Sequence, residues 1–184
     1  MSRPIRALAV TLAMCSTLFA GAACGGRSAV QEAAGAYIVV ATPSPSTPAE
    51  QQKFARSRFV ANAGLAAGAT YQWIVKPWKA GTFKKGAKGR KAALAKAGLA
   101  GTFAYNRLKA ARHNAQGDPA LAKALAPLAA GIDGLGNLPS RLRNGDEAAA
   151  SSFADVVGRT KSVSKGMGTP VRNQYPTARQ LAAG

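Results

Sequence analysis

Residues that carry out covalent or metal chemistry are scarce in this chain. Its 184 residues include two cysteines, one histidine and seven acidic side chains. One histidine with scattered acids makes no recognisable set of metal ligands, and no motif ties His113 to a cysteine, serine or carboxylate partner. We therefore predict no metal site, no cofactor and no catalytic centre, and we expect His113 to help cap the C-terminus of a helix.

Acidic residues are the second shortage, because 25 lysines and arginines accompany only seven aspartates and glutamates. The formal net charge is +18, and it is unevenly distributed. No acid lies between Glu50 and Asp118, whereas that interval holds 14 of the cations. A field of one sign attracts polyanions, over a Debye length of about 8 Å at physiological salt. The charge favours an anionic partner such as lipid, wall polymer, an acidic protein or nucleic acid.

The first 23 residues have the three parts of a secretory signal. Arg3 and Arg6 precede an uncharged, mostly apolar run from Ala7 to Ala20, and three small residues follow it. With those small residues the uncharged run is still shorter than the roughly 20 residues that a transmembrane helix needs. We predict that residues 1–23 are a cleaved signal peptide.

The stretch "GAAC", residues 21–24, resembles the lipobox of bacterial lipoproteins, in which small residues precede a cysteine that receives a diacylglycerol. Ala22, Ala23 and Cys24 match the pattern, whereas Gly21 stands where an aliphatic residue is commonest. The resemblance implies that Cys24 is the lipidated first residue of an exported protein on the outer face of the cell membrane. Cleavage at an ordinary small-residue site, giving a secreted protein with one free thiol, stays open.

The mature chain has no disulfide to stabilise it, since Cys15 leaves with the signal. It depends on an apolar core in one domain of ordinary size. We predict a lipid-anchor tether and proline-rich linker over residues 24–50, a helical domain over 51–165 and a flexible tail over 166–184, where no hydrophobic period is sustained.

Small residues recur at helical spacing in two stretches, which we predict to be helices over residues 53–75 and 90–113. The glycines that share these small faces are Gly64 and Gly68 in the first helix and Gly98 and Gly101 in the second. Small faces allow helices to approach closely. We therefore predict that these glycines lie where the two helices pack together in an antiparallel hairpin.

Two further helices are predicted by their caps and apolar stripes. Asp118 and Pro119 are typical of an N-cap and a first helical position, and Pro127 should kink the helix that follows. The last helix should run from about Asp146 to Gly166. Because no stretch alternates as a strand does, we predict an all-α fold, a small bundle of about four helices built on the Gly/Ala-rich hairpin.

The segment that joins the hairpin helices, "KPWKAGTFKKGAKGRK", is the candidate functional site. Pro77 should end the first helix, because it has no amide hydrogen. The segment also contains Trp78 and Phe83 and seven cations, which are Lys76, Lys79, Lys84, Lys85, Lys88, Arg90 and Lys91. Amphipathic rings suit a membrane interface, and each nearby cation adds about 1 kcal/mol of attraction to an anionic leaflet. We predict a surface-binding site for anions, made of these cations and Trp78. The alternative is a solvated loop with Trp78 in the core.

These features together favour an exported, lipid-anchored envelope protein with a basic hairpin. A nucleic-acid-binding protein is the first alternative, supported by the charge but without a recognition motif and in an unsuitable compartment. A membrane-inserting hairpin is the second. It is weakened because alanine and glycine contribute little transfer energy and Lys96 interrupts its second arm.

Overall fold

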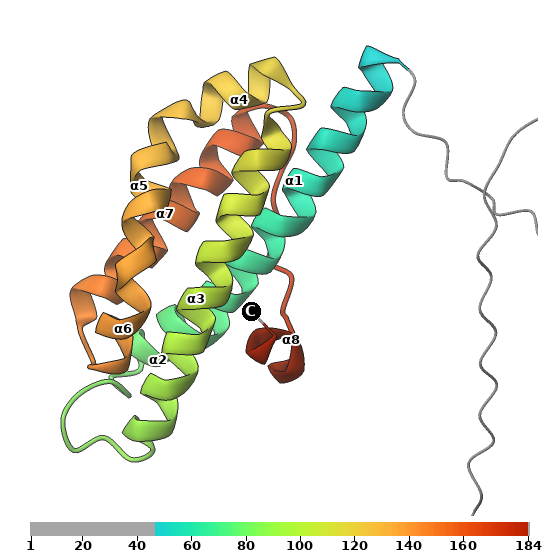
Figure 1. Ribbon diagram of the computed structural model, residues 1–184. Helices are drawn as coiled ribbons and strands as arrows, with labels where there is room; N and C mark the ends of the chain where they lie inside the picture. The colour runs from blue at the N-terminus through green and yellow to red at the C-terminus, as the bar shows by residue number, and fades with distance from the viewer. Residues whose placement is uncertain (1–46, 184) are drawn as a thin grey trace, which may run out of the picture. The chain divides into compact units, whose positions relative to one another are not determined.

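The computed structural model describes residues 47–183, and within that range every regular element is helical. Four long helical segments pack side by side, and a short fifth helix follows at the C-terminal end (Figure 1). The prediction of an all-α, small helical bundle is confirmed. The predicted signal peptide, Cys24 and nearly all of the predicted linker lie outside the described residues.

The first segment begins at a capping box. The Thr47 hydroxyl accepts a hydrogen bond from the N–H of Glu50, and the Glu50 carboxylate accepts one from the N–H of Thr47. From there α1 (Pro48–Thr70) passes through a π-helical turn (Tyr71–Val75) into α2 (Lys76–Lys79). The helical segment therefore continues beyond its predicted end at Val75.

The π-helical turn explains why Pro77 does not end the helix. In a regular α-helix the proline ring would collide with the carbonyl group of Trp73, four residues earlier. The wider turn relieves that collision, and the N–H of Lys76 donates to the carbonyl oxygen of Tyr71, five residues earlier. The prediction that Pro77 stops the first helix is wrong for this reason.

The second segment, α3 (Arg90–Ala115), packs antiparallel to α1 and lies at the centre of the bundle (Figure 1). Both helices bury small side chains, so their backbones approach closely. The buried alanines include Ala63, Ala66 and Ala67 on α1 and Ala97, Ala100 and Ala104 on α3. The antiparallel hairpin therefore forms as predicted, with buried alanines on both of its helices.

The glycines predicted at the helix contact receive other parts of the chain. A Cβ atom on Gly68 would lie 1.8 Å from the carbonyl oxygen of Gln174, and the C-terminal segment also covers Gly64. On α3, the side chain of Arg143 covers Gly98. The remaining glycine, Gly101, faces Leu142 and Phe153. The prediction that the four glycines join the two helices to each other is wrong.

The third segment follows the buried cap Asp118 and is interrupted twice. Its parts are α4 (Pro119–Leu125), a 3-10 turn (Ala126–Leu128), α5 (Ala129–Gly134), a second 3-10 turn (Leu135–Asn137) and α6 (Leu138–Arg143). Pro127 lies in the first turn, as its missing amide hydrogen predicts. The α6 helix was not predicted. The fourth segment, α7 (Glu147–Gly166), is capped by Asp146 and agrees with the prediction.

The C-terminal residues pack on the bundle instead of forming a flexible tail. Residues 169–177 run without helical structure along α1, where the N–H of Gln174 donates to the carbonyl oxygen of Gly64 at 2.9 Å (Figure 1). The final helix, α8 (Ala178–Ala182), follows them. Val171 and Leu181 are only 6% and 4% exposed, because they join the same core as the long helices.

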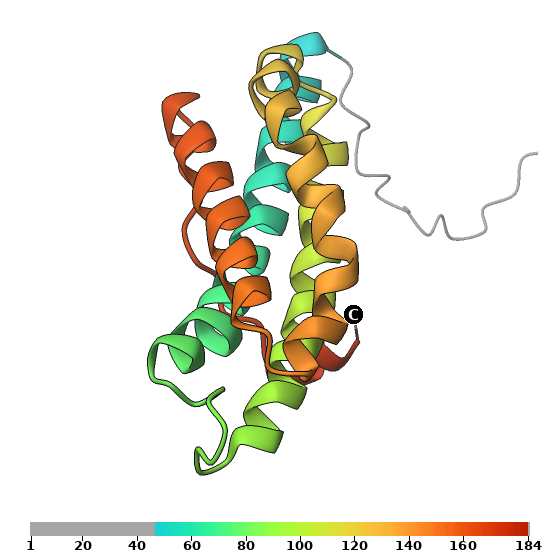
Figure 2. The ribbon, with the colours of Figure 1, turned by 90° about the vertical axis from the view of Figure 1, so that its left-hand side faces the viewer.

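The first turn of α1 and the loop of residues 80–89 lie at opposite ends of this bundle (Figure 1 and Figure 2). The start of α4 and the end of α7 lie near the first turn of α1, whereas α6 and the start of α7 lie near the loop. None of the helices between residues 47 and 183 combines the length and the apolar character that crossing a bilayer requires.

Candidate functional site

Tight turns give the loop between α2 and α3 a defined backbone. The N–H of Thr82 donates to the carbonyl oxygen of Pro77 at 3.0 Å, and the N–H of Lys84 donates to that of Gly81 at 3.1 Å. Gly81 and Gly89 adopt positive φ angles of 71° and 75°, which residues with a Cβ atom rarely adopt. The loop therefore reverses the chain within a few residues and leaves its lysine side chains on the outside.

Two side chains hold the loop against the bundle. Phe83 is 2% exposed, and its carbonyl oxygen accepts a hydrogen bond of 2.8 Å from Nε of Arg90. The guanidinium of Arg90 also lies close to Gly145, in the turn before α7. Arg90 was predicted to belong to the anion-binding surface, but the structure gives it an internal partner. Its main contact is with the loop it follows.

Trp78 also connects this end of the hairpin to α7. Its ring is partly buried against the core, and its Nε1 donates to Oε2 of Glu147 at 3.4 Å. The structure thus agrees with the alternative that Trp78 packs in the bundle rather than lying exposed at a membrane interface. Because Phe83 is buried too, the loop presents neither of its aromatic rings fully to solvent.

The remaining cations of the predicted site are exposed. These are Lys76, Lys79, Lys84, Lys85, Lys88 and Lys91. None of them takes part in the three ion pairs found among residues 47–183, which are Arg56–Asp118, Arg112–Asp133 and Arg141–Asp146. We call these six lysines the basic end of the bundle.

Two acids near the basic end have contacts of their own. Asp146 lies 2.6 Å from Nη2 of Arg141 and accepts from the first N–H groups of α7. The hydrogen bond from Arg141 lowers the pKa of Asp146 below its usual value, so this carboxylate is ionised and paired at neutral pH. Glu147 contacts Trp78. The positive charge of the lysines is therefore largely uncompensated.

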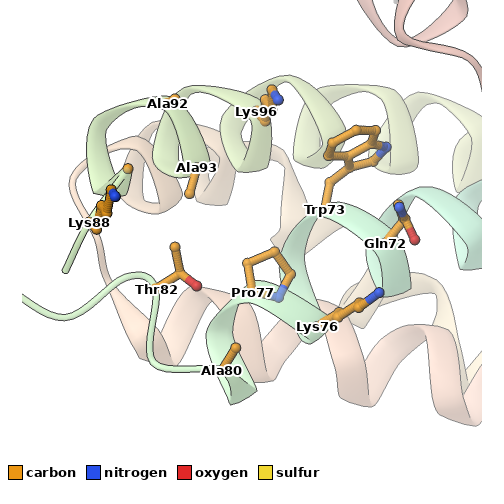
Figure 3. A pocket seen from close by; sticks show the side chains of 11 residues that line it. Gln72, Trp73, Lys76, Pro77, Ala80, Thr82, Lys88, Ala92, Ala93 and Lys96 are labelled. Atoms are coloured by element: carbon orange, nitrogen blue, oxygen red, sulfur yellow. The ribbon is translucent and has the colours of Figure 1, made fainter.

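A cleft of about 430 Å³ opens beside the basic end, between the π-helical turn, α2, the loop and the first turns of α3 (Figure 3). Trp73, Pro77 and Ala93 form its apolar walls. Three lysines surround it, and each comes from a different element: Lys76 from α2, Lys88 from the loop and Lys96 from α3. No carboxylate among residues 47–183 lines this cleft.

Trp73 is the largest side chain in the cleft. Nζ of Lys96 lies 5.4 Å from the centre of its ring, within the range of a cation–π contact. The six-membered ring faces the cleft and the ring nitrogen lies on the far side (Figure 3). That nitrogen is buried without a hydrogen-bond partner in the described part of the chain.

The predicted site residues thus divide into two groups. Lys76 and Lys88 line the cleft, whereas the exposed cations Lys79, Lys84, Lys85 and Lys91 lie outside it. Trp73 and Lys96 were not predicted to belong to the site. Trp73 lies four residues before Pro77, and Lys96 lies three residues after Ala93. Each therefore shares a helical face with a residue of the cleft wall. Only the hairpin geometry shows that the two faces meet.

Elsewhere in residues 47–183, no three histidine, cysteine or acidic side chains come together as metal ligands. His113 is exposed in the last turn of α3. No protein-family model, curated protein or solved structure matches this chain. The residues of the basic end and of the cleft are therefore the basis for assigning a function.

Proposed function

We propose that this chain is an exported, lipid-anchored cell-envelope protein whose basic end binds an anionic polymer of the envelope. The observation that carries the proposal is the group of six exposed lysines around one loop, none of which forms an ion pair with any of residues 47–183. Exposed charges of one sign raise the local concentration of a polyanion and release its counterions when it binds. This mode of binding needs no deep pocket and no catalytic group.

Two features favour a polymer over the lipid surface to which the chain would be anchored. Neither aromatic ring of the loop is presented for insertion between lipid headgroups, because Phe83 is buried and Trp78 is partly buried against Glu147. In addition, a tether that ends at Thr47 enters the bundle at the end remote from the basic end (Figure 1). An anchored bundle can therefore direct its lysines away from its own membrane.

The test compares three surfaces. The full chain, purified in neutral detergent, is passed over poly(glycerol phosphate) beads, phosphatidylglycerol vesicles and phosphatidylcholine vesicles. We expect the protein to be retained on the polymer and not on phosphatidylcholine. Salt should release it from the polymer, because exposed charges are screened within about 8 Å near 0.15 M. Stronger retention on phosphatidylglycerol than on the polymer would show that the target is anionic lipid and not the polymer.

Two matched variants locate the binding surface. One variant changes Lys79, Lys84, Lys85 and Lys91 to glutamine. The other makes the same change at four exposed cations in the first half of α1, in α4 and in the last turn of α7, which are Lys53, Arg58, Lys123 and Lys165. Both remove the same charge. We expect only the first variant to lose most of its polymer binding. Equal losses in both variants would mean that net charge, and not the basic end, causes the binding.

The anchor is tested separately. The lipobox-like "GAAC" motif motivates the change Cys24→Ser, which removes the only thiol that could receive a lipid at that position. We expect the variant to be released into the medium or to accumulate as the uncleaved precursor. A membrane fraction and a mass identical to those of the unchanged protein would disprove the anchor without affecting the proposal for the basic end.

A further inference from the structure

We propose that the cleft lined by Trp73 binds a small organic phosphate, with its phosphate group among the three lysines and a flat apolar part against the indole ring. This site shares Lys76 and Lys88 with the basic end. It requires neither the lipid anchor nor the lysines outside the cleft. Its volume of about 430 Å³ lies within the range of about 300–1,000 Å³ that small-molecule sites occupy.

Charge is the first argument for a phosphate. Lys76, Lys88 and Lys96 come from three different elements, yet all three line one cleft that contains no carboxylate from the described part of the chain. The ammonium groups of these lysines repel one another across the cavity. A doubly charged anion bound between them attracts all three and so offsets the repulsion. Lysine binds phosphate as a point charge, so it needs no planar geometry from its partner.

The start of α3 adds to this field. Gly89 is its N-cap residue and lines the cleft, and it has no side chain with which to cap the first N–H groups of the helix. The positive end of the helix dipole therefore lies beside the lysines. A bound anion would take the place that a capping side chain has at α4 and α7, where Asp118 and Asp146 accept from the first N–H groups.

Trp73 is the argument for a flat apolar part. Its six-membered ring faces the cleft, with Pro77 beside it and the small side chain of Ala93 opposite (Figure 3). The small residue leaves room for a planar group on the ring, and stacking on an aromatic ring favours such a group without requiring particular hydrogen bonds. An inorganic ion would use the lysines and leave this wall uncovered.

Two polar side chains at the cleft are free to fix the orientation of a ligand. Gln72 and Thr82 both line it, and neither makes a side-chain hydrogen bond to any of residues 47–183. Both can donate as well as accept. A few polar groups placed on an apolar cavity are the usual pattern of a site that selects a small molecule.

Phenyl phosphate is the simplest probe that combines both parts. We expect it to bind the full chain, purified in neutral detergent, at least about tenfold more tightly than inorganic phosphate or phenol does in calorimetric titrations, because each of these keeps only half of the contacts. The change Trp78→Phe leaves Trp73 as the only tryptophan. In that variant phenyl phosphate should change the fluorescence of Trp73. Equal affinities for phenyl phosphate and inorganic phosphate would overturn the proposal.

Variants test the position of the ligand. Lys96→Met keeps the side-chain stem and removes the charge, and Ala93→Leu fills the space opposite the ring. Each should weaken phenyl phosphate binding by at least about tenfold, whereas Lys123→Gln, on the remote α4, should leave it unchanged. Thermal melts confirm that each variant is folded. Unchanged binding in the folded Lys96→Met and Ala93→Leu variants would overturn the site.

The same probe distinguishes this inference from the polymer proposal. The variant with glutamine at positions 79, 84, 85 and 91 should lose poly(glycerol phosphate) and keep phenyl phosphate. If polymer binding persists while phenyl phosphate fails to bind, only the cleft proposal is wrong. If poly(glycerol phosphate) competes with phenyl phosphate for Trp73, the phosphate in the cleft belongs to the polymer rather than to a free small molecule.

Discussion

Thr70 places its hydroxyl oxygen in the core, where no hydrogen-bond partner reaches it within residues 47–183. Leaving such a group buried and unpaired costs about 1–3 kcal/mol, so its replacement by a methyl group removes a penalty. We expect Thr70→Val to leave the free energy of unfolding unchanged or to raise it, as measured by urea denaturation.

Thr160 is the matched control for this prediction. It is 2% exposed, and its hydroxyl donates to the carbonyl oxygen of Val156 at 2.8 Å. The change Thr160→Val removes that hydrogen bond and should lower the free energy of unfolding by about 1 kcal/mol. If Thr70→Val proves as destabilising as Thr160→Val, the hydroxyl of Thr70 has a partner in solution.

Asp118 makes the stability depend on pH. Burial alone raises the pKa of this carboxyl, but the hydrogen bonds from Arg56 and from the N–H groups of Leu121 and Ala120 outweigh burial and lower the pKa below its usual value of 3.8. The unfolded chain therefore binds a proton at higher pH than the folded chain does. The stabilisation is complete above the unfolded value and is lost as the pH falls through the folded value.

The expected result is a loss of stability on acidification that Asp118→Asn reduces. Asparagine can still cap α4, but it has no charge for Arg56 and does not titrate. The difference in urea midpoint between the two proteins should be constant near neutral pH and should shrink as the pH falls below 3.8. A difference that stays constant to lower pH would show that the ion pair does not contribute.

At the scale of elements, the contact between α1 and the C-terminal segment depends on Gly68. A Cβ atom there would lie 1.8 Å from the carbonyl oxygen of Gln174, a distance that forces the backbone of one segment to move. We expect Gly68→Ala to detach residues 169–183, to lower the melting temperature and to make that segment sensitive to protease. The buried side chains of Val171 and Leu181 would then lose their contacts.

Gly158 supplies the opposite control for the same substitution. It lies exposed within α7, and a Cβ atom on it would meet nothing within 4 Å. Alanine favours a helix interior over glycine by about 1 kcal/mol, so Gly158→Ala should raise the melting temperature. A stabilising effect of both substitutions would mean that the C-terminal segment does not lie on Gly68.

Comparison of the elements shows which features the sequence can predict. The cap at Asp118 was predicted because an N-cap hydrogen bond joins residues two or three positions apart, and the last helix was predicted to begin near Asp146, which caps it in the structure. The π-helical turn, which accommodates Pro77, was not predicted, and neither was α6. Both depend on the tertiary setting of the chain and not on a local pattern. The residues that cover Gly64 and Gly68 lie more than a hundred positions later, so no local pattern identifies them.

The candidate site shows the same limit. The lysines of the loop were predicted from their charge and position between two helices. The cleft was not, because it requires the faces of Trp73 and Lys96 to meet across the hairpin. The internal role of Arg90 was missed as well, since its hydrogen bond goes to the carbonyl group of Phe83 and not to a side chain that a charge pattern would reveal.

At the scale of the whole molecule, 25 lysines and arginines accompany seven acids, and self-repulsion of this excess should destabilise the compact state. Added salt should weaken this repulsion more than it weakens the attraction within the three ion pairs found between residues 47 and 183. We expect the melting temperature to rise between about 0.01 M and about 0.3 M sodium chloride, where the Debye length falls from about 30 Å to below 8 Å.

The variant with glutamine at Lys79, Lys84, Lys85 and Lys91 checks the cause. It removes four charges that lie close together, so its melting temperature should be higher at low salt and should rise less with added salt. A melting temperature that falls with salt in the unchanged protein would show that the ion pairs outweigh the repulsion.

The distance between the first turn of α1 and the basic end determines how far from an anchoring membrane the lysines can extend. The 23, 5 and 4 residues of α1, the π-helical turn and α2 span about 48 Å at about 1.5 Å each. If Cys24 is held in a bilayer, the 23 residues from there to position 46 add at most about 80 Å when fully extended. The lysines would then contact targets throughout a layer of at most about 130 Å above the membrane. A tethered protein of this length samples the depth of an envelope rather than a single surface.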